Sequence, residues 1–281
     1  MFTTLVSTDT LARHLDDPDW VIIDCRFVLT DPSAGRRAYA HGHIPGAHYA
    51  DLNEDLSAPV TPASGRHPLP DPRQLAVRLG AWGIDPGTQV VVYDGSFGAI
   101  AVRLWWLLRW LGHGAVALLD GGLPKWRREH RPITTVVPQP TAARFDVRPD
   151  DERWVDSTFV EGILGRQDYR LLDARAEERY IGLVEPLDPV PGHVPGALNA
   201  PFEDNLDVSG VFLPPAELRE RYTALLAGAA PSQAIHMCGS GVTACHNILA
   251  MELAGLPGAR LYAGSWSEWI RDRRRPISKA V

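Results

Sequence analysis

The sequence predicts two α/β domains that arose by duplication, each of them a parallel sheet flanked by helices. The chain has 281 residues, a length that suits two domains. Short apolar runs alternate with helical patterns, and several segments recur in the same order in both halves. We place the first domain at residues 1–138 and the second at 150–281. Residues of about 134–153 are polar and proline-bearing with no sustained period, so we expect a linker there.

The internal repeat is visible by eye. Its paired segments lie between 143 and 150 residues apart, and they are 22–26 (IIDCR) with 171–175 (LLDAR), 41–47 (HGHIPGA) with 191–197 (PGHVPGA), and 121–126 (GGLPKW) with 264–269 (GSWSEW). Because the order is kept and the spacing drifts by only a few residues, the unit that was duplicated is a whole domain and not a solenoid repeat.

The strands and helices expected in each half indicate where a functional site would lie. Buried strands are expected at 21–23, 90–93, 116–119, 170–172, 234–237 and 260–262. Residues 90–93 and 234–237 are each followed by a glycine-containing loop and a helical pattern, at 99–111 and 242–254. Ligands of open α/β sheets bind beyond the carboxyl ends of the strands, and Cys238 lies at such an end.

Composition excludes several classes of function. The net charge is −6 and no basic block is present, which argues against a nucleic-acid partner. The first residues lack the charged and apolar regions of a signal peptide. Residues 99–111 form the most apolar stretch, but it is short and interrupted by Arg103 and Arg109, so no membrane span is expected. Three cysteines cannot form a disulfide framework, which favours a reducing, cytoplasmic setting.

The run 236–244 (HMCGSGVTA) carries the predicted active site. Glycines at 239 and 241 allow the loop to curl its backbone N–H groups around the sulfur of Cys238. The N-terminus of the following helix adds further donors and the positive end of its dipole, which favours a thiolate nucleophile. The alternative is a buried structural cysteine beside a helix cap. The first copy carries Asp94 at the equivalent position, so we expect that domain to be non-catalytic.

These motifs resemble the two-domain rhodanese family of sulfurtransferases over essentially the whole chain. The run CGSGVTA, the repeated HIPGA and HVPGA segments, and LLDAR carry the resemblance, which is closest to the 3-mercaptopyruvate sulfurtransferase branch. It implies that Cys238 accepts sulfane sulfur as a persulfide from a small anionic donor, with 3-mercaptopyruvate favoured and thiosulfate as the alternative. A thiol, a protein thiol or cyanide would then take the sulfur. No metal or organic cofactor is implied.

The resemblance also implies roles for other residues. Arg179 would bind the anionic donor together with loop residues Gly239, Ser240, Gly241, Val242 and Thr243. His67 is implied as an auxiliary residue near the cysteine, and its accompanying aspartate falls on Asn53, which cannot ionise. A second arginine expected after a Glu-Pro pair is replaced by Leu187. The alternatives are a surface salt bridge for Arg179, a polar loop position for His67 and an ordinary helix cap or turn for Asn53.

Two other classes of function use similar residues. A cysteine phosphatase or arsenate reductase requires an arginine six positions after the cysteine, where this chain has Ala244. A non-catalytic binding module is the second alternative, and the intact loop at Cys238 argues against it. We expect Cys25 and Cys245 to be packed in the interior. His41 and His43 are expected to shape a turn and not to bind a metal.

Overall fold

The computed structural model describes residues 1–279 and divides them into two compact units. The first unit contains Met1–Ala58, Leu69–Asp150 and Ser209–Val211. The second contains Pro59–Pro68, Asp151–Val208 and Phe212 onward. The short segment Pro59–Pro68 therefore packs with the second unit although it precedes most of the first in sequence. Among the described residues, no helix is both long and apolar enough to cross a membrane.

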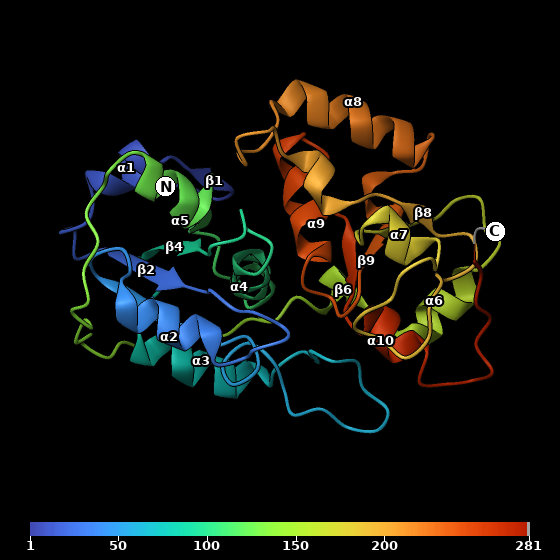
Figure 1. Ribbon diagram of the computed structural model, residues 1–281, viewed down its shortest axis with the longest axis horizontal. Helices are drawn as coiled ribbons and strands as arrows, with labels where there is room; N and C mark the ends of the chain where they lie inside the picture. The colour runs from blue at the N-terminus through green and yellow to red at the C-terminus, as the bar shows by residue number, and fades with distance from the viewer. Residues whose placement is uncertain (280–281) are drawn as a thin grey trace. The chain divides into compact units, whose positions relative to one another are not determined.

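The first unit is a five-stranded parallel sheet in the order β1-β5-β4-β2-β3. Figure 1 shows α1 and α5 on one side of its strands and α2 and α3 on the other. The strands are β1 (Leu5–Val6), β2 (Trp20–Asp24), β3 (Ala47–Tyr49), β4 (Gln89–Tyr93) and β5 (Val116–Leu119). The helices are α1 (Thr8–Ala12), α2 (Ala34–His41), α3 (Pro72–Ala81), α4 (Ala101–Trp110) and α5 (Gly122–Arg128).

The second unit repeats this topology with the order β6-β10-β9-β7-β8, again all parallel. Its strands are β6 (Trp154–Val155), β7 (Arg170–Asp173), β8 (Leu198–Asn199), β9 (Ala234–Met237) and β10 (Arg260–Tyr262). Its α-helices are α6 (Ser157–Ile163), α7 (Glu177–Tyr180), α8 (Pro215–Leu226), α9 (Ala244–Leu253) and α10 (Ser265–Trp269), with 3-10 turns at Asp151–Arg153, Phe202–Asn205 and Pro231–Gln233. The predicted fold class, two duplicated parallel α/β domains, is confirmed.

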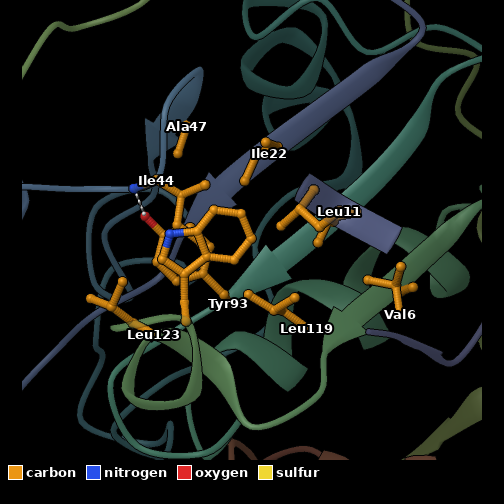
Figure 2. Packing of buried hydrophobic residues seen from close by; sticks show 11 residues of the cluster. Val6, Leu11, Ile22, Ile44, Ala47, Tyr93, Leu119 and Leu123 are labelled. Carbon is orange, nitrogen blue, oxygen red and sulfur yellow. Dashed lines mark hydrogen bonds between the residues drawn. The ribbon is translucent and has the colours of Figure 1, made fainter. Parts of the chain in front are cut away.

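Local sequence explains these elements. The β-branched run of β4 is buried along its whole length, as expected for a central parallel strand with helices on both faces. Asp71 caps α3 by accepting hydrogen bonds from Arg73 N and Gln74 N, and Pro72 begins the helix. One core cluster joins the sheet of the first unit to α1 and α5 through Leu11, Leu123 and other apolar residues (Figure 2).

The repeated sequence motifs form the same contacts in both units. Asp24 pairs with Arg26 in the first unit, and Asp173 pairs with Arg175 in the second, at 2.6 Å in each case. His43 stacks on Tyr39, while His193 stacks on Tyr180, with ring centroids 3.9 Å apart in both pairs. The Nδ1 atom of each histidine lies 2.8 Å from the carbonyl oxygen of its tyrosine partner. His43 forms an isolated bridge to Thr134 just before the turn at residues 45–46, whereas His41 is the last residue of α2 and lies in no turn.

The stretch at 134–153 packs mainly onto the first unit. Ala143 N donates to the Gly80 carbonyl, and Arg148 N donates to that of Leu111. Gly80 has no room for a side chain, because a Cβ there would lie 2.5 Å from the carbonyl oxygen of Ala143. Regular secondary structure resumes at the 3-10 turn that precedes β6.

Candidate active site

Cys238 directly follows β9, at the carboxyl end of the central strand of the second sheet. Residues 238–243 form the loop that leads into α9, whose first residue is Ala244. Gly241 adopts a left-handed φ of 76°, and a Cβ there would lie 2.3 Å from the carbonyl oxygen of Ala263. The loop therefore requires glycine at 241 for two reasons, backbone conformation and close packing.

Hydrogen bonds fix the cysteine from both sides. Gly241 N lies 3.2 Å from Cys238 Sγ and donates to it, which stabilises negative charge on the sulfur. The Cys238 N–H donates to Ser265 Oγ at 3.1 Å, while the Cys238 carbonyl accepts from Trp266 N at 3.0 Å. Cys238 itself is only 2% exposed. These hydrogen bonds hold the cysteine in one position at the start of the loop.

The equivalent loop of the first unit binds a carboxylate. The Asp94 carboxylate accepts four backbone hydrogen bonds of 2.7–2.9 Å, from Ser96, Gly98, Ile100 and Ala101. That loop is thus already filled by an anion from its own chain. In the second unit, by contrast, the N–H groups of Ser240, Val242 and Thr243 donate to no other residue within 1–279. These donors can serve a bound anion.

A network of charged side chains surrounds this loop. Arg175 is fully buried and pairs with Asp173 and Glu185. Burial disfavours its charge, but Asp173, Glu185 and the nearby Cys238 outweigh this and raise the pKa of Arg175. Arg179 on α7 is 18% exposed and pairs with Glu185 at 2.8 Å and Asp188 at 3.3 Å.

His67 and Ser240 lie together. His67 Nδ1 is 2.7 Å from Ser240 Oγ, and both side chains are buried. Asn53 lies in an exposed turn of the first unit, where its N–H donates to Asp51 Oδ1 at 2.9 Å. The described contacts of Asn53 are therefore those of an ordinary turn.

His236, Cys25 and Cys245 are buried close to the strand ends or to the cysteine loop. Burial lowers the pKa of His236 to about 3, so this imidazole is neutral at pH 7. Burial, aided by Asp24, Asp94 and Asp55, raises the pKa of the Cys25 thiol well above its usual value. Cys245 is fully buried, and its thiol donates to the Gly241 carbonyl. Cys25 and Cys245 are packed in the interior, as predicted. Within residues 1–279, no cluster of three or more His, Cys, Asp or Glu side chains could hold a metal ion.

Four polar residues of this region were not predicted from the sequence to belong to the site. Ser265 accepts the Cys238 N–H, and its own φ of 53° is left-handed. Arg66, Glu185 and Asp188 belong to the charged network. Arg66 had one available signal, its position next to His67. Glu185 had one signal, the Glu-Pro pair that the resemblance uses, whereas nothing local links residue 188 to the cysteine loop.

Comparison with known proteins gives consistent matches. The model of the rhodanese-like domain matches twice, at residues 7–129 and 156–272. A Pseudomonas aeruginosa protein named as a probable 3-mercaptopyruvate sulfurtransferase is 51% identical, over 98% of this chain and 97% of the relative. A Mycobacterium tuberculosis protein provisionally named thiosulfate sulfurtransferase SseB is 38% identical, over 99% of this chain and 97% of the relative.

Solved structures agree with the sequence matches. The crystal structure of SseA from Escherichia coli, described as a 3-mercaptopyruvate sulfotransferase with the rhodanese fold, superposes with a TM-score of 0.79. The two chains are 34% identical, and the match covers 95% of this chain and all of SseA.

Proposed function

The chain belongs to the rhodanese family of sulfurtransferases, and from this premise we propose that Cys238 carries sulfane sulfur as a persulfide, with 3-mercaptopyruvate as the favoured donor. The observation that carries the proposal is the loop around Cys238, whose backbone donors are not all used within the described residues. Its Gly241 N–H donates to the sulfur, while the N–H groups of Ser240, Val242 and Thr243 are available to an anion. We propose the second domain as the catalytic one, since Asp94 fills the equivalent loop of the first.

The first half-reaction transfers one sulfur atom. The Cys238 thiolate attacks the sulfur of 3-mercaptopyruvate, so an S–S bond forms while the C–S bond of the donor breaks. The electron pair of that bond goes to the donor carbon, which takes up the proton of the donor thiol and leaves as pyruvate. Ser240 and His67, 2.7 Å apart, are suited to pass this proton. We assign no step to Asn53.

The loop would hold the product of this step. A persulfide anion on Cys238 extends into the region lined by the amides of residues 239–243, where backbone donors stabilise its charge without reorganisation. In the second half-reaction a thiolate, a protein cysteine or cyanide attacks the outer sulfur and releases the Cys238 thiolate. Arg179 is proposed to bind the anionic end of the donor, supported by its position beside Gly239.

Thiosulfate is a second candidate donor. It is supported by the Mycobacterium tuberculosis relative that is provisionally named a thiosulfate sulfurtransferase. It presents the same two features to the site, an outer sulfur and anionic oxygens. Because the chemistry requires a reduced Cys238, we propose a reducing, cytoplasmic setting.

The test is thiocyanate formation from cyanide, with 3-mercaptopyruvate and thiosulfate supplied in parallel. We expect the wild-type chain to prefer 3-mercaptopyruvate and Cys238→Ser to lose turnover with both donors. Cys245→Ser is the matched control, because this cysteine is buried beside the same loop and is expected to leave kcat essentially unchanged. Preference for thiosulfate would reverse the choice of donor. Turnover that survives Cys238→Ser would refute the mechanism.

A further inference from the structure

Two guanidinium groups lie beside Gly239. A Cβ placed on this glycine would be 3.0 Å from Arg66 Nη2, and 3.5 and 3.6 Å from Arg179 Nη2 and Nη1. Gly239 is the residue directly after Cys238, so two positive charges lie one residue away from the proposed nucleophile. Both arginines belong to the second unit, Arg66 through the segment Pro59–Pro68.

Several donors of these two groups are unused. Arg66 binds Asp188 through Nη1, whereas Arg179 binds Glu185 and Asp188 through Nε and Nη2. Arg66 Nε is buried and has no hydrogen-bond partner in the described chain. Neither Arg66 Nη2 nor Arg179 Nη1 donates to another residue within 1–279. A buried N–H without a partner is costly, so a ligand that accepts from it gains a large part of that free energy.

Contacts with neighbouring residues hold Arg66 in place. Asp188, whose side chain is only 3% exposed, binds both arginines and so holds them side by side. The Arg66 N–H donates to Ser267 Oγ at 3.0 Å. Gly65 packs so closely that a Cβ there would lie 2.5 Å from the Gly264 carbonyl oxygen. Such a preformed pair of charges loses little conformational entropy when an anion binds.

We infer that Arg66 is a second anion-binding residue of the site and that it works with Arg179 as a two-guanidinium clamp for the carboxylate of the sulfur donor. The inference rests on the sulfur transfer proposed above and adds the residue that orients the donor. Two guanidinium groups match the two oxygens of a carboxylate at one end of a short donor. The sulfur at its other end then faces Cys238. Leu187, which follows Pro186 in the same network, supplies no charge.

Alkylation of Cys238 tests the clamp without any sulfur donor. Iodoacetate carries a carboxylate and iodoacetamide is its neutral analogue, and with both reagents the thiolate displaces iodide. In Arg66→Gln we expect the rate with iodoacetate to fall about tenfold or more, the range for losing one charge-assisted hydrogen bond. The rate with iodoacetamide should change by less than about twofold. Arg274→Gln is the control, since this arginine is 91% exposed and pairs with Asp272.

The alkylation experiment can give three results. A selective loss with iodoacetate supports the clamp. Equal slowing with both reagents would mean that Arg66 only supports the loop. No change with either reagent would mean that Arg66 does not face the ligand. Either of these two results would overturn the inference. If the wild-type chain transfers sulfur from no donor, the proposed function fails, yet the ratio of the two alkylation rates still decides whether the clamp exists.

A kinetic measurement extends the test to the reaction. In Arg66→Gln we expect KM for 3-mercaptopyruvate to rise about tenfold to a hundredfold, while kcat falls less. Arg66→Lys should be intermediate, because an ammonium keeps the charge but not the planar pair of donors. Gly239→Ala places a methyl group 3.0 Å from Arg66 Nη2 and should also raise KM. An unchanged KM in both Arg66→Gln and Gly239→Ala would contradict the inference.

Discussion

Gly241 shows how one residue determines the geometry of the site. Its φ of 76° suits glycine, and a Cβ at this position would meet the Ala263 carbonyl at 2.3 Å. The same residue donates the hydrogen bond to Cys238 Sγ. A substitution here therefore changes the backbone that carries the donor as well as the local packing.

Gly241→Ala is expected to remove most sulfur-transfer activity and to lower the free energy of unfolding by more than Gly228→Ala does. Gly228 is the matched control: its φ of 90° is also left-handed, but a Cβ there meets nothing within 4 Å. The control should cost about 1–2 kcal/mol from backbone strain alone. Urea denaturation and turnover with cyanide check both variants. Equal destabilisation by the two would contradict the role given to the Ala263 contact.

The residues of the site differ in how far the sequence could predict them. Cys238 and its loop were predictable because strand, glycines and helix follow one another within ten residues. Arg66 and Asp188 were not, since they lie 122 positions apart and only the tertiary structure pairs them. His67 and Ser240, 173 positions apart, were linked only through family resemblance.

At the scale of elements, the two strand–loop–helix units differ mainly in what fills the loop. Asp94 supplies its own carboxylate to four backbone N–H groups, whereas the Cys238 loop keeps donors free for a ligand. Three residues after Asp94, Phe97 has a φ of 56°, whereas Gly241, three residues after Cys238, has a φ of 76°. The same turn is thus built with a large side chain in one unit and with none in the other.

Asp94→Ala is expected to destabilise the first unit by about 3 kcal/mol or more, because several buried N–H groups lose their acceptor at once. The matched control is Asp31→Ala, whose side chain is 47% exposed and whose loss should leave the free energy of unfolding almost unchanged. Hydrogen exchange of the amides at residues 96–101 measures the effect locally. Unchanged protection there in Asp94→Ala would show that the carboxylate does not hold the loop together.

Asp94→Cys is expected not to create a second sulfur carrier. The thiol would lack the two oxygens that bind four N–H groups, and Phe97 occupies the position at which the Cys238 loop has glycine. Peptide mass spectrometry after incubation with the donor reads out each cysteine separately. Donor-dependent gain of sulfur at residue 94 would disprove this expectation.

At the scale of the whole molecule, two histidines whose pKa values are lowered by burial contribute to the pH dependence of stability. The pKa of His236 is lowered to about 3 by burial, and that of His48 to about 4 by the same cause. Both groups bind a proton more readily in the unfolded chain than in the folded one. Their contribution is fully present above pH 6.5 and is lost progressively as the pH falls toward the folded values.

His236→Leu should therefore flatten the acid side of the stability profile. When the pH falls from 7 to 5, His236 should lower the free energy of unfolding of the wild-type chain by about 2 kcal/mol. The variant should show no such decrease. Urea denaturation at several pH values measures the difference in slope. If the two profiles are parallel, His236 does not bind a proton on unfolding, and the assignment is wrong.

The duplication was the most predictable property of the whole chain. The repeated motifs predicted the fold class correctly because each motif has the same structural role in both units, as the Asp24–Arg26 and Asp173–Arg175 pairs do. The membership of Pro59–Pro68 in the second unit could not be predicted. A segment that packs away from its sequence neighbours leaves no periodic signal, and this one carries Arg66 and His67.

The proposed reaction requires that Cys238 carries the transferred sulfur. Its most direct test is intact and peptide mass spectrometry after incubation with 3-mercaptopyruvate alone, without an acceptor. We expect a gain of one sulfur atom on the peptide that contains Cys238, removed by later addition of cyanide and absent in Cys238→Ser. A chain that releases pyruvate while Cys238 keeps its unmodified mass would show that Cys238 is not the sulfur carrier.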